Sequence, residues 1–168
     1  IIGDYTKSKH IGILGTKGTV QSQSYPIEIE KIFPDIQVYQ HACPLWVPLV
    51  ENNEYDSSGA DYFIKKDLHE LLNISGKIDT ILLACTHYPL LMKKIKKFSP
   101  KNIIIISQGE IIAQSLADYL SRNAEIEARC SRNGSVRFFT TDSTQDFDRH
   151  SAIFFSKTVT SQHVDLSE

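Results

Sequence analysis

The 168 residues contain 41% apolar and 23% charged side chains, a balance that is typical of globular proteins and argues against intrinsic disorder. Eighteen Lys and Arg residues against 20 Asp and Glu residues give a net charge of −2. This balance excludes the broad basic surface of a protein that binds nucleic acid or an anionic membrane. The length allows one domain, or one domain and part of another. Because the sequence opens at Ile1 and its single methionine is Met92, we expect a processed chain or a piece of a longer one.

The sequence also argues against a membrane-embedded or secreted protein. No apolar run approaches the ~18 residues that a spanning helix needs, and the first thirty residues lack the pattern of a secretory signal. We therefore expect a soluble, cytoplasmic protein. The odd number and wide spacing of Cys43, Cys85 and Cys130 predict free thiols rather than a disulfide framework.

Short β-branched runs alternate with stretches of helical period, a pattern that predicts a mostly parallel sheet with helices on both faces. The expected strands, in chain order, are residues 11–14, 36–40, 80–84, 102–106 and 136–140. Residues 41–51 should form a loop, because Pro44 and Pro48 cannot sit in a central strand.

Five helices are expected between or after these strands. The first follows residues 15–19 and should be shortened or bent by Pro26. The others are residues 60–72, a helix that starts after Pro89, and residues 109–122 and 144–155. The apolar face expected on the helix of residues 60–72 consists of Tyr62, Phe63, Leu68, Leu71 and Leu72.

In open parallel sheets, ligands bind at the carboxyl ends of the strands. Three segments with chemically useful side chains fall there: residues 15–19, 41–51 and 85–89. In the last of them, Cys85 precedes a helix start and stands two residues from His87. Both influences lower a thiol pKa, which predicts a reactive thiol, although a lone cysteine at a strand end is also a common buried apolar residue.

Four blocks of sequence resemble one protein family. Residues 84–91 read Ala-Cys-Thr-His-Tyr-Pro-Leu-Leu, which is similar to the Gly-Cys-Thr-His-Tyr-Pro-Leu-Leu signature of glutamate racemases, members of the aspartate/glutamate racemase family. Residues 43–51 resemble the family's Cys-Pro-Leu-Phe-Val-Pro-Leu-Val-Glu. Residues 11–19 resemble Ile-Gly-Val-Ile-Ala-Thr-x-Gly-Thr, and residues 138–142 resemble Phe-Tyr-Thr-Thr-Gly-Asp.

The resemblance implies a cofactor-independent isomerase that interconverts L- and D-glutamate and supplies D-glutamate for peptidoglycan, and so for bacterial cell wall biogenesis and cell shape. The family uses two cysteines on opposite faces of the substrate. Cys85 matches the second of them, His87 matches the histidine that assists it, and Glu51 matches an auxiliary acidic residue. The positions that match substrate-binding residues are Thr86, Thr16 and Thr19.

The same resemblance implies a two-lobed α/β fold. Residues 10–106 would form one complete flavodoxin-like lobe, residues 107–157 the C-terminal part of the other lobe, and residues 158–168 a flexible tail. The first-domain motifs Asp-Ser-Gly and Cys-Asn-Thr are absent from these residues, so the second lobe should be incomplete. Its apolar surface should then favour self-association into a homo-oligomer.

Other functions remain open on the sequence. The chain could bind an acidic amino acid without turning it over. The pairs His41-x-Cys43 and Cys85-x-His87 could form a tetrahedral zinc site, although a spacing of one leaves little room for both ligands of a pair to converge. The lysines of residues 93–97 are more typical of a solvated helix face than of a phosphate or nucleic-acid patch. Glutamate is therefore the expected partner, with no nucleic acid and no membrane.

Overall fold

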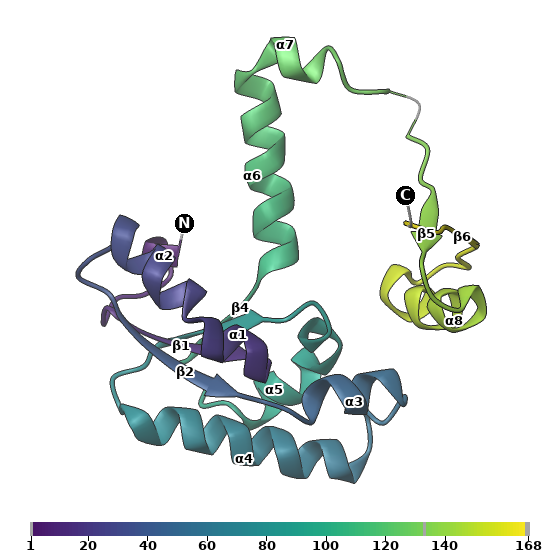
Figure 1. Ribbon diagram of the computed structural model, residues 1–168. Helices are drawn as coiled ribbons and strands as arrows, with labels where there is room; N and C mark the ends of the chain where they lie inside the picture. The colour runs from purple at the N-terminus through teal and green to yellow at the C-terminus, as the bar shows by residue number, and fades with distance from the viewer. Residues whose placement is uncertain (1, 133, 167–168) are drawn as a thin grey trace. The chain divides into compact units, whose positions relative to one another are not determined.

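The computed structural model describes residues 2–132 and 134–166 (Figure 1). Its contacts divide the chain into two compact units, Ile1–Leu116 and Ala117–Glu168. The boundary falls within a helix. The expected division into two lobes after residue 106 stays a prediction. No helix in the described part of the chain is long and apolar enough to cross a membrane.

The first unit contains a parallel four-stranded sheet with the strand order β2-β1-β3-β4. The central strands, β1 (His10–Gly15) and β3 (Thr80–Ala84), are almost entirely buried. The outer strands are β2 (Gln37–Ala42) and β4 (Ile104–Ser107). This order confirms the expected flavodoxin-like α/β sheet, in which β1 and β3 flank the point where the chain reverses its direction of winding.

Helices cover both faces of this sheet (Figure 1). The helices α1 (Lys17–Ser22) and α2 (Ser24–Ile32) belong to one face, where Ile29 packs against Ile11 and Ile13. The helices α4 (Ser58–Ile74) and α5 (Met92–Phe98) belong to the other. Gly12 permits the close approach of α4, because a Cβ atom there would lie 2.7 Å from Leu71 Cδ2.

The first helical segment is interrupted, as expected, but not at the proline. Gln23 separates α1 from α2 with a left-handed φ of 54°. Pro26 lies in the first turn of α2, where a missing N–H leaves no helical hydrogen bond unmade. Upstream of β1 the chain forms a short 3₁₀ turn, η1 (Ile2–Asp4).

The prediction of a loop at residues 41–51 is largely wrong. His41 and Ala42 complete β2, and Trp46–Glu51 forms the helix α3. Pro48 is the third residue of α3, one of the first-turn positions whose N–H has no partner within a helix. The two prolines exclude a strand here, but they do not exclude a helix start.

The buried face of α4 also differs from the expected one. Tyr62 is exposed, and the helix buries a stripe spaced at about four residues, namely Ala60, Ile64, Asp67, Leu68 and Leu71. After β3, the expected helix begins with the 3₁₀ turn η2 (Tyr88–Leu91), which leads into α5. The helix α6 (Gln108–Arg122) follows β4.

The second unit contains α7 (Ala124–Glu127), β5 (Phe138–Thr140), α8 (Thr144–Phe155) and β6 (Ser161–His163). Phe138 on β5 packs against Phe147 and Phe155 of α8. The expected flexible tail at residues 158–168 is not what the structure shows: β6 pairs in parallel with β5, and Val159 is buried. The pairing supplies hydrogen-bond partners for backbone groups that a flexible tail would leave to solvent. Residues 167 and 168 lie outside the described part of the chain.

Candidate active site

The carboxyl ends of three strands meet at one edge of the sheet. Gly15 at the end of β1 pairs with Ala42 of β2 on one side and with Ala84 of β3 on the other. The chain segments that leave this edge therefore begin side by side, and they start with Thr16, Cys43 and Cys85. Three segments that are distant in sequence are brought together, as the parallel-sheet prediction required.

Cys85, His87 and Glu51 form a row at this edge. The Sγ atom of Cys85 lies 3.9 Å from His87 Nδ1, within hydrogen-bonding range for sulfur. The opposite ring nitrogen, His87 Nε2, lies 3.4 Å from Glu51 Oε1. Glu51 reaches the imidazole from the last residue of α3, the helix that replaces the expected loop. The structure thus joins the three residues that the family resemblance placed in catalytic positions.

The thiol of Cys85 is not activated in the way the sequence suggests. Burial raises its pKa above the ordinary value for cysteine. The backbone N–H groups of His87 and Tyr88 act in the expected opposite direction, but the negative charge of Glu51 adds to the effect of burial. The expectation of a lowered pKa is therefore wrong, because desolvation of a half-buried thiolate outweighs the dipoles at the following turn.

A cavity of about 920 Å³ within the first unit opens beside this thiol. Cys85 and Thr86 line it, together with Pro89, Lys96 and Gln108 from the segments that follow β3 and β4. Its volume lies in the range of small-molecule sites, roughly 300–1,000 Å³. Thr86 thus faces this cavity, and Lys96 adds a positive charge to its wall. The substrate-binding role of Thr86 stays a prediction from the resemblance.

Thr16 and Thr19 lie at the same sheet edge but do not line this cavity. Thr16 caps α1, accepting a hydrogen bond from the backbone N–H of Thr19, and the two hydroxyl oxygens are 2.9 Å apart. The Thr19 side chain lies against Gly15, beside Ala84. Their substrate-binding role remains a prediction from the resemblance.

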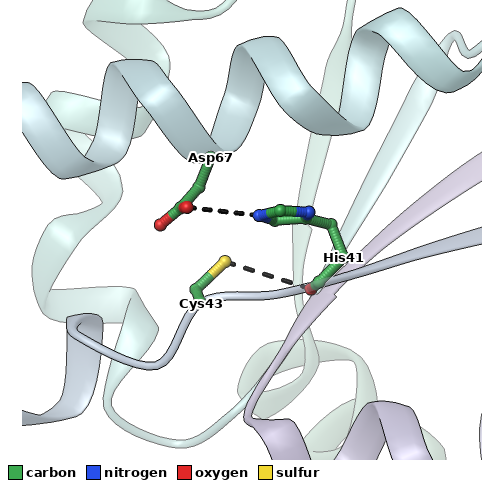
Figure 2. Close-up of side chains that lie close together, drawn as sticks. All are labelled: His41, Cys43 and Asp67. Atoms are coloured by element: carbon green, nitrogen blue, oxygen red, sulfur yellow. Dashed lines mark hydrogen bonds and ion pairs between the residues drawn. The ribbon is translucent and has the colours of Figure 1, made fainter.

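The four residues considered for a zinc site, His41, Cys43, Cys85 and His87, do not come together as one group of metal-ligand spacing. His41 and Cys43 instead converge on Asp67 of α4, with their ligand atoms all within 4.8 Å of one another (Figure 2). In the described part of the chain this is the group with metal-ligand spacing, and it does not include Cys85 or His87. The sequence analysis did not name Asp67 as a candidate ligand. Its position within the buried stripe of α4 was the signal that could have indicated it.

Cys43 itself is unsuited to be the second acid/base thiol. It is 1% exposed, and burial, reinforced by the charge of Asp67, raises its pKa far above the usual range.

The lysine-rich stretch of α5 also differs from the solvated helix face that was expected. Lys94 is buried and donates to the backbone carbonyl of Ser57 and to the carboxylate of Asp61.

Comparisons with known proteins show which proteins the chain is similar to. No protein-family model matches the chain. Glutamate racemase 2 of Caldanaerobacter subterraneus is 36% identical over 155 residues, a match that covers 92% of this chain and 57% of that protein. The crystal structure of a glutamate racemase isoform from Bacillus anthracis superposes with a TM-score of 0.84 at 33% identity, covering 97% of this chain and 60% of that one. The Francisella tularensis glutamate racemase, solved with D-glutamate, has a TM-score of 0.79 over 95% of this chain and 58% of that one, and at 24% identity shows the fold alone.

The fold and the site together define a flavodoxin-like α/β protein with a cysteine, a histidine and a carboxylate at the carboxyl edge of its sheet. The chain is a homologue of glutamate racemases, and it corresponds to the C-terminal portion of these proteins. It spans between 57% and 60% of the length of the relatives described above.

Proposed function

We propose that this chain supplies one acid/base thiol of a glutamate racemase, an isomerase that inverts the Cα centre of glutamate without a cofactor. The observation that carries the proposal is the row of Cys85, His87 and Glu51, with contacts of 3.9 Å and 3.4 Å. In this assignment Cys85 exchanges the Cα proton of L-glutamate. The protein would act in the cytoplasm and supply D-glutamate for peptidoglycan.

The chemistry accounts for the three residue types. The Cα–H bond of an amino acid is a very weak acid, so its base must be strong and already in place when the substrate arrives. The carboxylate of Glu51 favours the imidazole tautomer with its proton on Nε2, which leaves the Nδ1 lone pair directed at Cys85. His87 can then accept the thiol proton, and Glu51 holds the imidazole in this orientation. The thiolate removes the Cα proton from one face of the substrate.

Inversion also requires a proton donor on the opposite face. Cys43 does not meet this requirement because it is buried and strongly held in its protonated form. We therefore propose that the 168-residue chain catalyses proton exchange but not inversion. Thr86 at the cavity wall would bind the substrate, and Thr16 and Thr19 at the adjacent strand end would assist it.

A second candidate function is binding of an acidic amino acid without turnover. The observation that favours it is the raised pKa of Cys85, since little thiolate is present at neutral pH. Lys96 in the cavity wall suits a carboxylate ligand in either case.

The test is incubation of the chain with L-glutamate in D₂O, followed by NMR of the Cα proton and chiral chromatography. We expect slow loss of the Cα–H signal without D-glutamate, and no loss with Cys85→Ala. Cys130→Ser, which alters an exposed thiol in the second unit, should behave as the wild type. Racemisation at typical enzyme rates of about 1–10³ s⁻¹ would contradict the single-thiol assignment. Saturable binding of glutamate with no exchange would support the binding function instead.

A further inference from the structure

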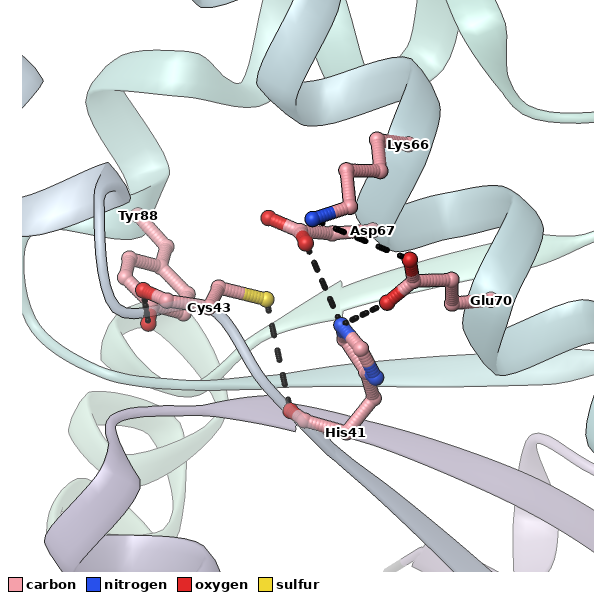
Figure 3. Close-up of polar contacts among 6 residues, drawn as sticks. All are labelled: His41, Cys43, Lys66, Asp67, Glu70 and Tyr88. Carbon is pink, nitrogen blue, oxygen red and sulfur yellow. Dashed lines mark hydrogen bonds and ion pairs between the residues drawn. The ribbon is translucent and has the colours of Figure 1, made fainter.

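A second cluster of titratable side chains lies between β2 and α4, outside the Cys85 site (Figure 3). His41 projects from β2 towards α4, where its Nε2 atom is 3.2 Å from Asp67 Oδ1 and 3.5 Å from Glu70 Oε2. Cys43 follows β2 by one residue, and its thiol donates to the backbone carbonyl of His41. Asp67 and Glu70 are three residues apart on α4, so both carboxylates face the same imidazole.

The burial of this cluster requires an explanation. Asp67 is 5% exposed and lies in the apolar stripe of α4 between Ile64 and Leu71. Carboxylates are almost never buried to this extent unless they are paired or coordinate a metal ion. Here the carboxylate lies against two groups that can each lose a proton, the His41 imidazole and the Cys43 thiol. A metal cation satisfies all three groups at once.

The cluster is reachable from solvent on one side. A cavity of about 250 Å³ is lined by His41, Asp67 and Glu70, with Pro44 and Lys66 at its wall. Glu70 is half-exposed there, and one of its carboxylate oxygens lies 3.8 Å from Lys66 Nζ. An ion and its water can therefore approach from the side of Glu70, while Cys43 closes the site from within the core.

We propose that His41 Nε2, Cys43 Sγ and an Asp67 carboxylate oxygen form a binding site for Zn²⁺, with Glu70 or water as the fourth ligand. A set of one nitrogen, one sulfur and one oxygen suits zinc, whereas Mg²⁺ and Ca²⁺ prefer oxygen alone. Bonds of about 2.0–2.3 Å place tetrahedral ligand atoms roughly 3.3–3.8 Å apart, so a group already within 4.8 Å needs only side-chain adjustments.

Zinc binding at this site has a defined proton balance. The ion replaces the proton on Cys43 Sγ, and the neutral imidazole of His41 carries its one proton on Nδ1 when Nε2 binds the metal. One proton therefore leaves for each ion bound. The site does not rest on the proposed racemase chemistry, because neither Cys85 nor His87 takes part in it.

Cobalt provides the direct test, because tetrahedral Co²⁺ bound to a thiolate shows both visible d–d bands and a sulfur-to-metal charge-transfer band. We expect the 168-residue chain to bind one Co²⁺ with both features, and Zn²⁺ to displace it. Cys43→Ser should remove the charge-transfer band. Asp67→Asn should weaken binding by more than the roughly 10–100-fold that loss of an outer-shell partner costs. The matched controls, Cys85→Ser and Cys130→Ser, should retain the spectrum.

A folded wild-type chain without the charge-transfer band would overturn the proposal. So would a band that survives Cys43→Ser and disappears in Cys85→Ser, since the metal would then occupy the other cysteine site. If the variants fail to fold, calorimetry of the wild type in two buffers of different ionisation enthalpy measures the released proton. Zn²⁺ binding without proton release, or equal thermal stabilisation by Mg²⁺, would also exclude the site.

Discussion

At the scale of single residues, the protonation of Cys85 depends on its burial and on the charge of Glu51. Both raise the thiol pKa, so the thiolate should form above the ordinary cysteine value of about 8.5. We expect alkylation of Cys85 by iodoacetamide to increase through the alkaline range and not near neutrality. Glu51→Gln removes a negative charge that disfavours the thiolate, so it should shift the midpoint to lower pH.

Peptide mass spectrometry in a Cys130→Ser background measures this midpoint at Cys85 without interference from the exposed thiol. Glu70→Gln is the matched control, because this carboxylate faces His41 and not the Cys85 site. A wild-type midpoint below the ordinary cysteine pKa, or an equal shift in both variants, would contradict the prediction.

At the scale of elements, Asp79 ties the segment before β1 to the start of β3. Its carboxylate accepts hydrogen bonds from Thr6 Oγ1 and from the backbone N–H groups of Lys7 and Ser8. Burial opposes ionisation, but these donors prevail and lower the pKa of Asp79 to about 2. Because the folded pKa lies below the unfolded value, the carboxylate stabilises the fold above about pH 4, and this contribution is lost as the pH falls towards 2.

Asp79→Asn should therefore lower the free energy of unfolding at neutral pH by about 2 kcal/mol and flatten its dependence on pH between about 4 and 2. Urea denaturation at several pH values measures both effects. Asp35→Asn is the control, since the exposed ion pair of Asp35 with Lys9 should contribute less than about 1 kcal/mol. Equal losses in the two variants would show that the Asp79 contacts add nothing specific.

At the scale of the whole molecule, α6 carries a stripe of exposed apolar side chains. Ile112, Leu116 and Tyr119 share one side of the helix, and all three are exposed. We expect the chain to self-associate through this stripe, with a sedimentation coefficient that rises with concentration.

Leu116→Lys should weaken this association, and Gln114→Lys, which adds the same charge on the opposite side of α6, should not. Sedimentation velocity over a concentration series distinguishes the two. A monodisperse monomer at high concentration would count directly against association through α6.

Much of the fold could be predicted from local patterns. The strands expected at residues 11–14 and 80–84 are present as β1 and β3, and the structure places them at the centre of the sheet. The helix α3 could not be predicted in this way, because proline excludes a strand but is compatible with a first helical turn. The strand β6 was missed since its polar residues are ordered by backbone pairing with β5, a contact between distant segments.

The sequence by itself determined the α/β class and the likeness to glutamate racemases, and it singled out Cys85 as the candidate acid/base residue, because these depend on local periodicity and on contiguous motifs. Only the tertiary structure decided that Glu51 contacts His87 and that Asp67 joins His41 and Cys43. It also reversed the expected direction of the Cys85 pKa. The physical reason is the same in each case: contacts across the sheet edge and desolvation in the core depend on which distant segments meet, and residue spacing carries no record of this.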